Sequence, residues 1–407
     1  MMSTWEQRFA HRTQRMTSST IRELLKLTEQ PDFISFAGGL PAPEVFPVQK
    51  VAVAVDTLMK EMPVQALQYS TTEGFGPLRD LLARKMSLPG INITRDDILI
   101  THGSQQALDL LGKVFLDPGD RVIVEAPTYL GALQAWNAYE ADYECVRSDE
   151  HGMVVEELAQ ALRRNPKFIY LVPNFHNPSG ATLSLERRKL LVKLAAEAGV
   201  PIIEDDPYGQ IRFEGESLPS LLTLDDQQRA SSHGYQGNVI YLSTFSKILA
   251  PGLRVAWAVA PVPVMRRLVQ AKQGSDLQTS SFTQMLVYEV AREGYLDQHL
   301  PVIRDTYRER RDVMLAALQA HMPPGAHWNK PAGGMFLWCT LPDGVNSIEL
   351  LQHCLKNKVA FVPGYSFFPC EGGENTMRLN FSNAKPEMIR EGIARLGAAI
   401  REMMVAV

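Results

Sequence analysis

Between about residues 96 and 262, short apolar runs alternate with stretches whose apolar residues recur at helical spacing. Each run is rich in β-branched residues, which predicts a buried strand. The expected strands are Asp97–Thr101, Arg121–Val124, Phe168–Val172, Pro201–Ile203, Val239–Leu242 and Val255–Ala260. Helices are expected between several of them, including Ala107–Phe115, Glu156–Arg163 and Leu185–Ala198. This alternation predicts an α/β fold with a mostly parallel or mixed sheet between helices.

Both ends of the chain depart from this alternation. The start predicts a helix and then an extended Gly/Pro-rich segment, and residues from about 283 to 320 predict one long helix rich in charge pairs. A small α+β unit is expected near the C-terminus, with strands at Met335–Cys339, Val359–Val362 and Met377–Phe381 and a helix from Pro386. We therefore expect a large domain and a small domain to which both chain ends contribute. The expected boundaries are 1–48 for the N-terminal segment, 49–300 for the large domain and 301–407 for the small domain.

Composition and charge argue against nucleic acid and membrane as partners of the protein. The chain has 407 residues, is 45% hydrophobic and 21% charged, and carries a net charge of −4, as is typical of a globular protein. Because it has no tract of basic residues, nucleic acid is not expected as a main partner. No apolar run approaches the ~20 residues that span a bilayer, and the start has no signal-peptide pattern. We therefore expect no membrane partner and a cytoplasmic location.

Cysteine chemistry is not expected to carry the function. Cys145, Cys339, Cys354 and Cys370 are scattered along the chain. They form no CxxC pair and no cluster with histidine, so they match neither a zinc site nor a disulfide framework. We expect four buried structural thiols and no bound metal.

Lys247 follows one of the predicted strands and is the strongest candidate for chemistry. A partly desolvated lysine amine loses proton affinity and can condense with an aldehyde, which is how proteins anchor pyridoxal phosphate. The hydroxyls of Thr244 and Ser246 flank it, and Arg254 follows in the same segment, so these three side chains could bind a phosphate. The alternative is a solvated lysine, so the hypothesis depends on whether other segments supply the rest of such a site.

Two further strand ends carry groups that this cofactor needs. Gly103–Gln106 opens a predicted helix, and its backbone N–H groups and the Ser104 hydroxyl would form a phosphate cradle; a plain serine-capped turn is the alternative. Glu204–Tyr208 begins with three acids, of which one needs a cationic partner such as a protonated ring nitrogen. Tyr208 could reach the phenolate oxygen of the cofactor, and a metal site or salt-bridged loop is the alternative. No Walker or dinucleotide-binding glycine motif is present.

Three more residues would complete a pyridoxal phosphate site. Asn177, before a proline, could donate its amide to the phenolate oxygen or serve only as a turn residue. Tyr129 could stack on a flat ring or be an ordinary core aromatic. Arg378, in a predicted strand, needs an anion, which would be a substrate carboxylate or an internal salt-bridge partner. His176 is left out because a lone histidine is more often simply hydrogen-bonded.

With these residues in place, the chain resembles the fold-type I, class I/II pyridoxal phosphate-dependent aminotransferases from end to end. The resemblance is strongest at Ser243–Arg254, Asn174–Gly180 and Glu204–Tyr208. Ser35–Pro43 and Ile21–Lys26 make it most similar to the 2-aminoadipate and kynurenine/2-aminoadipate branch, which also includes broad-specificity enzymes for aromatic and branched amino acids. The resemblance implies an aspartate aminotransferase-like fold whose large domain binds the cofactor.

The family pattern implies a role for each matching residue. Lys247 would hold the cofactor as a Schiff base and transfer the proton during the reaction. Asp205 rather than Asp206 would pair with the ring nitrogen, because the motif places the acid three residues before the tyrosine. Asn177 and Tyr208 would bind the phenolate oxygen, and Tyr129 would stack on the ring. The implied phosphate ligands are Ser104, Gln105, Thr244 (where serine is common), Ser246 and Arg254. The implied contacts of the substrate carboxylate are Arg378, Asn177 and the Gly39 backbone.

The resemblance also implies roles for two residues that contact neither the cofactor ring nor the substrate α-carboxylate. Tyr69 resembles the family tyrosine that reaches the phosphate of the neighbouring subunit, which implies a homodimer with shared sites. Arg22 lies in the first turn of a helix predicted by the capping box Thr20-x-x-Glu23. In 2-aminoadipate enzymes an arginine at this place can bind the distal carboxylate of the substrate, and a solvated arginine is the alternative.

We therefore expect an aminotransferase that moves the amino group of an L-amino acid to a 2-oxo acid by ping-pong kinetics, with 2-oxoglutarate as the acceptor by resemblance. A β-lyase or decarboxylase with the same cofactor is the first alternative. The second is a transcription regulator, since some regulators carry this fold behind a winged-helix domain. A basic DNA-binding domain would then precede the fold, whereas Ser35–Pro43 already matches the enzyme pattern, which argues against a regulator.

Overall fold

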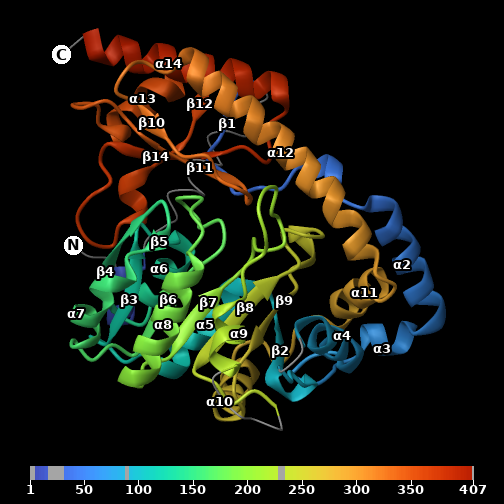
Figure 1. Cartoon of the computed structure of the whole chain (residues 1–407). Helices are drawn as coiled ribbons and strands as arrows, with labels where there is room; N and C mark the ends of the chain where they lie inside the picture. Colours follow the sequence, from blue (N-terminus) through green and yellow to red (C-terminus); the bar gives the residue numbers. More distant parts are fainter. Residues whose placement is uncertain (1–4, 17–31, 88–90, 228–233, 406–407) are drawn as a thin grey trace.

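The computed structural model describes residues 5–16, 32–87, 91–227 and 234–405. Its largest sheet has eight strands (Figure 1). In order across the sheet they are β2 (Ile98–Thr101), β9 (Ala256–Val259), β8 (Val239–Thr244), β7 (Ile202–Asp205), β6 (Phe168–Leu171), β3 (Arg121–Ala126), β4 (Asp142–Asp149) and β5 (Gly152–Met153). The five strands from β8 to β4 run parallel, whereas β9 is antiparallel to both its neighbours and β5 is antiparallel to β4. The predicted mostly parallel sheet is confirmed.

Two groups of helices pack on this sheet. In one group α5 (Ser104–Phe115) contacts α6 (Leu130–Asn137) and α10 (Val262–Gln273). In the other, α8 (Leu185–Ala198) contacts α7 (Leu158–Leu162) and α9 (Leu221–Asp226). The buried residues of α5 include Ala107, Leu108 and Leu111, which recur at the helical spacing that predicted this helix. The alternation of apolar runs therefore corresponds to alternating strands and helices.

The small domain is built around a second, antiparallel sheet (Figure 1). Its strands, in order, are β10 (His327–Trp328), β11 (Phe336–Thr340), β14 (Thr376–Asn380) and β13 (Val362–Pro363). β1 (Ile34–Ser35) pairs in parallel with β12 (Val359–Ala360), so a segment from the start of the chain joins this domain. The helices α13 (Ser347–Lys356) and α14 (Pro386–Val405) contact each other beside it. The exact domain boundaries stay a prediction.

The remaining helices lie outside these groups and include the long helix that reaches the small domain. They are α2 (Val48–Glu61), α3 (Pro63–Leu67), α4 (Gly76–Met86), α11 (Ser281–Ala291) and α12 (Tyr295–His321), with short 3-10 helices at His11–Arg15, Pro43–Val45, Arg95–Asp97, Val155–Glu157, Pro251–Leu253 and Gly364–Phe367. α11 packs against α2, α3 and α4, while α12 runs on to contact α14 of the small domain. Within the described ranges, no helix is both long and apolar enough to cross a bilayer.

The single helix expected over about 283–320 is wrong, because two helices occupy this stretch. α11 ends at Ala291, and α12 starts at Tyr295 after Gly294, whose backbone lies in the left-handed region at φ 75°. Glycine adopts this conformation without the steric penalty of a side chain, so it permits the break. The charge pairs on either side concealed this signal in the sequence.

The expectation of four buried thiols is also wrong for two of the cysteines. Cys145 in β4 and Cys370 form a disulfide across a sequence separation of 225 residues, whereas Cys339 and Cys354 are free and buried as expected. Cys370 follows the 3-10 helix Gly364–Phe367, which lies against the large domain, since the Phe367 carbonyl accepts a hydrogen bond from the Thr128 N–H at 2.8 Å. The pairing arises from this contact between domains, which the spacing of cysteines does not encode.

Removing this disulfide should destabilise the protein. We expect Cys370→Ser to lower the midpoint of thermal unfolding, because a link across a long loop restricts the unfolded chain and typically stabilises by about 2–4 kcal/mol. A dithiol reductant should lower the midpoint of the wild type by a similar amount and leave Cys370→Ser unchanged. Thermal unfolding with and without reductant measures both effects. An insensitive wild type would mean that the disulfide does not form.

Candidate active site

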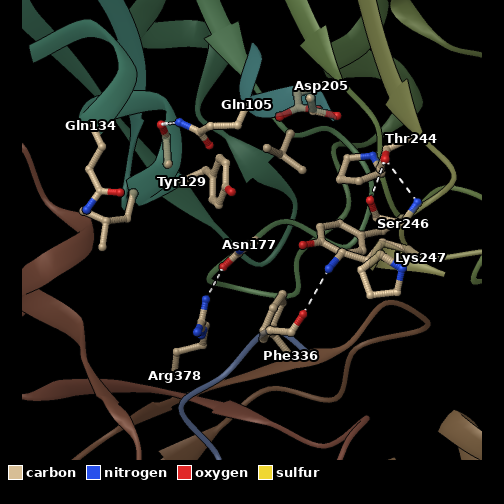
Figure 2. Close-up of a pocket in the computed structure, with 18 of the residues that line it drawn as sticks. Gln105, Tyr129, Gln134, Asn177, Asp205, Thr244, Ser246, Lys247, Phe336 and Arg378 are labelled. Atoms are coloured by element: carbon tan, nitrogen blue, oxygen red, sulfur yellow. Dashed lines mark hydrogen bonds between the residues drawn. The ribbon is translucent and has the colours of Figure 1, made fainter. Parts of the chain in front are cut away.

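A cavity of about 500 Å³ opens beyond the carboxyl ends of β3, β6, β7 and β8 (Figure 2). Parallel strands end at the same edge of a sheet, so residues just after these strands converge there. The predicted residues that line the cavity are Gly39, Ser104, Gln105, Tyr129, Asn177, Asp205, Tyr208, Thr244, Ser246, Lys247, Arg254 and Arg378. Tyr69 does not line it, and Arg22 lies outside the described residues.

Lys247 follows β8 and lies inside the cavity (Figure 2). Its Nζ donates a hydrogen bond to the Gly39 carbonyl at 3.0 Å, and no carboxylate of the described residues pairs with it. Burial, together with the nearby cations Arg254 and Arg378, lowers the pKa of the amine to about 8. An amine with such a pKa is partly unprotonated near neutral pH, as a nucleophile that attacks an aldehyde must be.

Glu204 and Asp205 end β7, and Asp206 follows it. These three acids have three different environments. Glu204 accepts hydrogen bonds from the backbone N–H groups of Leu221 and Leu222, both at 2.9 Å, and so caps the start of α9. Asp206 accepts hydrogen bonds from the Gly209 N–H at 2.8 Å and the Tyr241 hydroxyl at 3.2 Å. Only Asp205 lines the cavity. The acid closest to a bound ligand is therefore Asp205, and the other two have structural roles.

Asp205 keeps one carboxylate oxygen without a partner. Oδ2 accepts a hydrogen bond from the Tyr170 hydroxyl at 3.0 Å, whereas Oδ1 is buried and has no hydrogen-bond partner among the described residues. Burial raises the pKa of this carboxyl to about 7, while the hydrogen bond from Tyr170 lowers it. A buried acceptor without a donor is costly, so this oxygen fits a protonated ring nitrogen of a bound cofactor.

Another part of the cavity has the features of an anion site. Ser104 begins α5, where free backbone N–H groups and the helix dipole favour negative charge, and its Oγ is buried without a partner among the described residues. Thr244 donates its hydroxyl to Ser246 at 2.9 Å. The Arg254 guanidinium approaches Gly103 so closely that a Cβ there would overlap it. Gly103 also has φ 79°, so both space and backbone require glycine.

Aromatic and amide side chains line a further part of the cavity. Tyr129 precedes α6, and its ring lies so close to Gly131 that a side chain there would overlap it. Tyr208 is 4% exposed and packs edge-on against Phe336 with ring centroids 5.9 Å apart. Gln105 donates its side-chain amide to the Gly131 carbonyl at 2.7 Å, which fixes the start of α6 beside α5. These aromatic and amide groups form walls that suit a planar ring.

Arg378 brings the small domain to the cavity (Figure 2). It is 1% exposed, its Nη1 donates to Asn177 Oδ1 at 2.7 Å, and its Nη2 donates to the Ala37 carbonyl. The guanidinium lies over the rings of Phe336 and Phe367, at 4.3 and 5.1 Å from their centroids, and its Nε has no hydrogen-bond partner among the described residues. Burial lowers its pKa to about 10, so it stays charged at neutral pH. No carboxylate within the described ranges pairs with it, which disfavours the salt-bridge alternative.

Several residues of the cavity were missed in the sequence. Gln134, Phe336 and Val172 line it, and Tyr170 donates a hydrogen bond to Asp205 from outside the lining. Phe336 and Val172 lie in apolar runs that predict only core positions, while Gln134 lies in a helix without a distinctive motif. His176, which was left out, is absent from the lining and instead hydrogen-bonds Ser179 at 2.8 Å.

Comparisons with known proteins agree with this geometry. Residues 37–396 match the family model described as aminotransferase class I and II. The chain is 46% identical over 407 residues to aromatic-amino-acid aminotransferase 1 of Thermococcus litoralis, covering 98% of this chain and 95% of that protein. It is 45% identical over 404 residues to 2-aminoadipate transaminase of Thermus thermophilus, covering 99% of each.

A solved structure shows the same fold over the whole chain. The α-aminoadipate aminotransferase LysN of Thermus thermophilus, solved with N-(5'-phosphopyridoxyl)-L-leucine, superposes with a TM-score of 0.92 at 44% identity and covers 100% of both chains. The predicted fold is thus confirmed as aspartate aminotransferase-like, since Thermus thermophilus aspartate aminotransferase also superposes with a TM-score of 0.83 at 23% identity. The unpartnered atoms of Ser104, Asp205 and Arg378 fit the phosphate, ring nitrogen and substrate of such an enzyme. The chain belongs to the class I and II aminotransferases and is a pyridoxal phosphate-dependent aminotransferase.

Proposed function

We propose that this aminotransferase moves the amino group of an L-amino acid of the 2-aminoadipate, aromatic or branched-chain type to 2-oxoglutarate. The observation that carries the proposal is that the Lys247 amine and the Arg378 guanidinium line one cavity, and neither pairs with a carboxylate of the described residues. These are the two contacts that an α-amino acid needs, one at its amino group and one at its carboxylate. The names of the relatives, together with the phosphopyridoxyl-leucine bound to LysN, support these donor classes.

In this proposal the ends of the cavity hold the two ends of the cofactor. Pyridoxal phosphate supplies an aldehyde carbon and an electron-poor ring that stabilises negative charge at the substrate Cα. Asp205 would keep a proton on the ring nitrogen, Asn177 and Tyr208 would donate to the phenolate oxygen, and Tyr129 would stack on the ring. The phosphate is held by the residues of the anion site, namely Ser104, Gln105, Thr244, Ser246 and Arg254.

The protein then has two tasks during the reaction. Arg378, with the Gly39 backbone and Asn177, holds the α-carboxylate, which fixes the orientation of the substrate Cα. With the cofactor bound, Lys247 Nζ would take the proton from Cα and later donate it, since its lowered pKa lets it act as base and acid in turn. The first 2-oxo acid leaves before the second binds, so the kinetics are ping-pong. A β-lyase or decarboxylase with this site would instead yield pyruvate-type fragments or an amine.

We also propose a homodimer in which Tyr69 reaches the phosphate of the neighbouring subunit. Tyr69 is 79% exposed in the single chain, far more than is usual for a tyrosine with no partner surface. Val64 and Leu67 of α3, just before it, are 73% and 72% exposed. An exposed apolar patch of this kind supports a subunit interface. A cytoplasmic location stays a prediction from the sequence.

Arg22 is proposed to bind the distal carboxylate of an acidic donor such as 2-aminoadipate. Its support is the resemblance of Ile21–Lys26 and the name of the Thermus thermophilus relative, because Arg22 itself lies outside the described residues. A charge-assisted hydrogen bond of this kind is worth about 1.5–3 kcal/mol. Loss of the arginine should therefore reduce kcat/KM for acidic donors about 10- to 100-fold.

A donor panel tests the proposed function. Purified wild type and Arg22→Ala, each loaded with pyridoxal phosphate, are assayed with 2-aminoadipate, phenylalanine and leucine against 2-oxoglutarate, and the glutamate and 2-oxo acid formed are quantified. We expect equal amounts of the two products, and a loss in Arg22→Ala that is confined to 2-aminoadipate. Leucine is the internal control, since it has no distal carboxylate. Amine or pyruvate in place of the paired products would contradict transamination, and an equal loss for all donors would contradict the role of Arg22.

A further inference from the structure

Among the described residues, the side chain that hydrogen-bonds Asp205 is Tyr170, which lies outside the cavity lining. Tyr170 donates its hydroxyl to Oδ2 at 3.0 Å, while Oδ1 stays without a partner among the described residues. The Tyr170 side chain is 0% exposed and Asp205 is 2% exposed, so water does not compete for this hydrogen bond. The hydrogen bond therefore decides which of the two oxygens is available to a ligand.

Strand register and packing fix the position of the Tyr170 hydroxyl. Tyr170 on β6 pairs with Ile203 on β7, so Asp205, two residues further along, is its diagonal neighbour on the same face of the sheet. The Tyr170 ring packs edge-on against Trp136, with centroids 5.0 Å apart and an interplanar angle of 85°. A fully buried ring that packs against a tryptophan has little freedom to rotate its hydroxyl away.

We propose that Tyr170 is a positioning residue that orients Asp205, so that Oδ1 faces the cofactor ring nitrogen. The inference rests on the proposed pairing of Asp205 with that nitrogen. Burial and the neighbouring Asp206 both raise the pKa of Asp205, and the hydrogen bond from Tyr170 opposes them. Without the hydroxyl, the carboxyl would take up a proton more readily and would be a weaker partner for a protonated ring nitrogen.

The chain contains a matched control for this hydrogen bond. Tyr235, 0% exposed, donates its hydroxyl to Asp225 Oδ2 at 2.9 Å, and Asp225 is 1% exposed. Neither residue lines the cavity. Tyr235→Phe therefore removes one buried hydroxyl from one buried aspartate, as Tyr170→Phe does, but away from the cofactor. It also removes the hydrogen bond that the Tyr235 hydroxyl accepts from the Val239 N–H at 2.8 Å, so its cost in stability should be at least as large. A difference between the two variants reports on the cofactor rather than on stability.

The test measures how tightly the full-length enzyme holds its cofactor. Wild type, Tyr170→Phe, Tyr235→Phe and Asp205→Asn are converted to the pyridoxamine form, and free pyridoxamine phosphate is measured by ultrafiltration to give Kd. We expect Tyr170→Phe to raise Kd about 10- to 100-fold, as for a lost hydrogen bond to a charged group, and Tyr235→Phe to leave it unchanged. Steady-state kinetics should show a lower kcat for Tyr170→Phe with the KM of the donor unchanged, because the ring and not the substrate loses support.

A cofactor analogue that lacks the ring nitrogen separates positioning from packing. With such a carbocyclic pyridoxamine phosphate, wild type and Tyr170→Phe should bind equally. If Tyr170→Phe still binds the analogue more weakly, the tyrosine acts only through packing and the inference is overturned. If Tyr170→Phe binds pyridoxamine phosphate like wild type while Asp205→Asn does not, the inference alone fails. If Asp205→Asn also binds like wild type, the proposed role of Asp205 fails and the inference fails with it.

Low yield of Tyr170→Phe would not prevent the test. Tyr170→His places a ring N–H donor at the same strand position and is the second variant. The Kd of Tyr170→His for pyridoxamine phosphate should be nearer to the wild-type Kd than the Kd of Asp205→Asn is. A loss equal to that of Asp205→Asn, with an unfolding midpoint like that of Tyr235→Phe, would overturn the inference.

Discussion

Replacing Lys247 with alanine should nearly abolish transamination. The variant lacks the amine that holds the cofactor and carries the proton, and a positioned general acid–base alone contributes about 10²- to 10⁴-fold to a rate. The phosphate, ring and carboxylate contacts come from other residues, so the variant should still bind pyridoxal phosphate. Glutamate formation from 2-oxoglutarate measures the loss, and the visible absorbance of the protein-bound cofactor should disappear on dialysis. Full turnover in Lys247→Ala would contradict the assignment.

The pH dependence of cofactor attachment provides a second test of Lys247. Burial lowers the pKa of its amine to about 8, below the ordinary value of 10.5. The unprotonated fraction therefore grows about tenfold for each unit of pH below 8 and levels off above it. We expect the rate at which wild-type apoprotein gains cofactor absorbance to follow this curve. A rate that still rises steeply between pH 9 and 10.5 would indicate a solvated lysine with an ordinary pKa.

The sequence predicted the cavity well because of a general property of parallel sheets. Tyr129, Asn177, Asp205 and Lys247 each follow a strand, and β3, β6, β7 and β8 run parallel and adjacent in the structure. Residues after parallel strands meet at one edge whatever the details of packing. The contributions of Gly39 and Arg378 could not be derived in this way, because they come from the small domain. Gly39 was predicted from the family resemblance alone. Arg378 was predicted as an arginine in a strand that needs an anion, and the resemblance then specified the substrate carboxylate.

What the sequence could not provide depends on pairing between distant segments. Tyr170 lies inside an apolar run, so its sequence context predicts only a core aromatic, and its contact with Asp205 follows from the register of β6 against β7. The disulfide depends in the same way on how the loop of Cys370 meets β4. Neither register nor domain contact is encoded in local periodicity. The break at Gly294 is a local feature, but the charge pairs on either side led the sequence analysis to predict one continuous helix.

Replacing Arg378 with alanine should lower kcat/KM for every donor by about 10²- to 10⁴-fold. Two charge-assisted hydrogen bonds to the α-carboxylate, each worth about 1.5–3 kcal/mol, account for this range. The loss should appear mainly in KM, because the carboxylate contact is made before and during the reaction. Arg378→Lys should recover only part of it, since lysine keeps the charge and loses the planar pair of donors.

Donor methyl esters distinguish a substrate contact from structural support. Arg378 also hydrogen-bonds Asn177 and packs on Phe336, so alanine could disturb the cavity without any role in binding. An ester has no carboxylate charge for the guanidinium to bind, so wild type should use the acid far better than its methyl ester. Arg378→Ala should lose this preference and use both equally poorly. Discrimination between acid and ester depends on the cation that faces the carboxylate. If the variant still prefers the acid as strongly as wild type does, another residue therefore binds the carboxylate, and Arg378 only shapes the cavity.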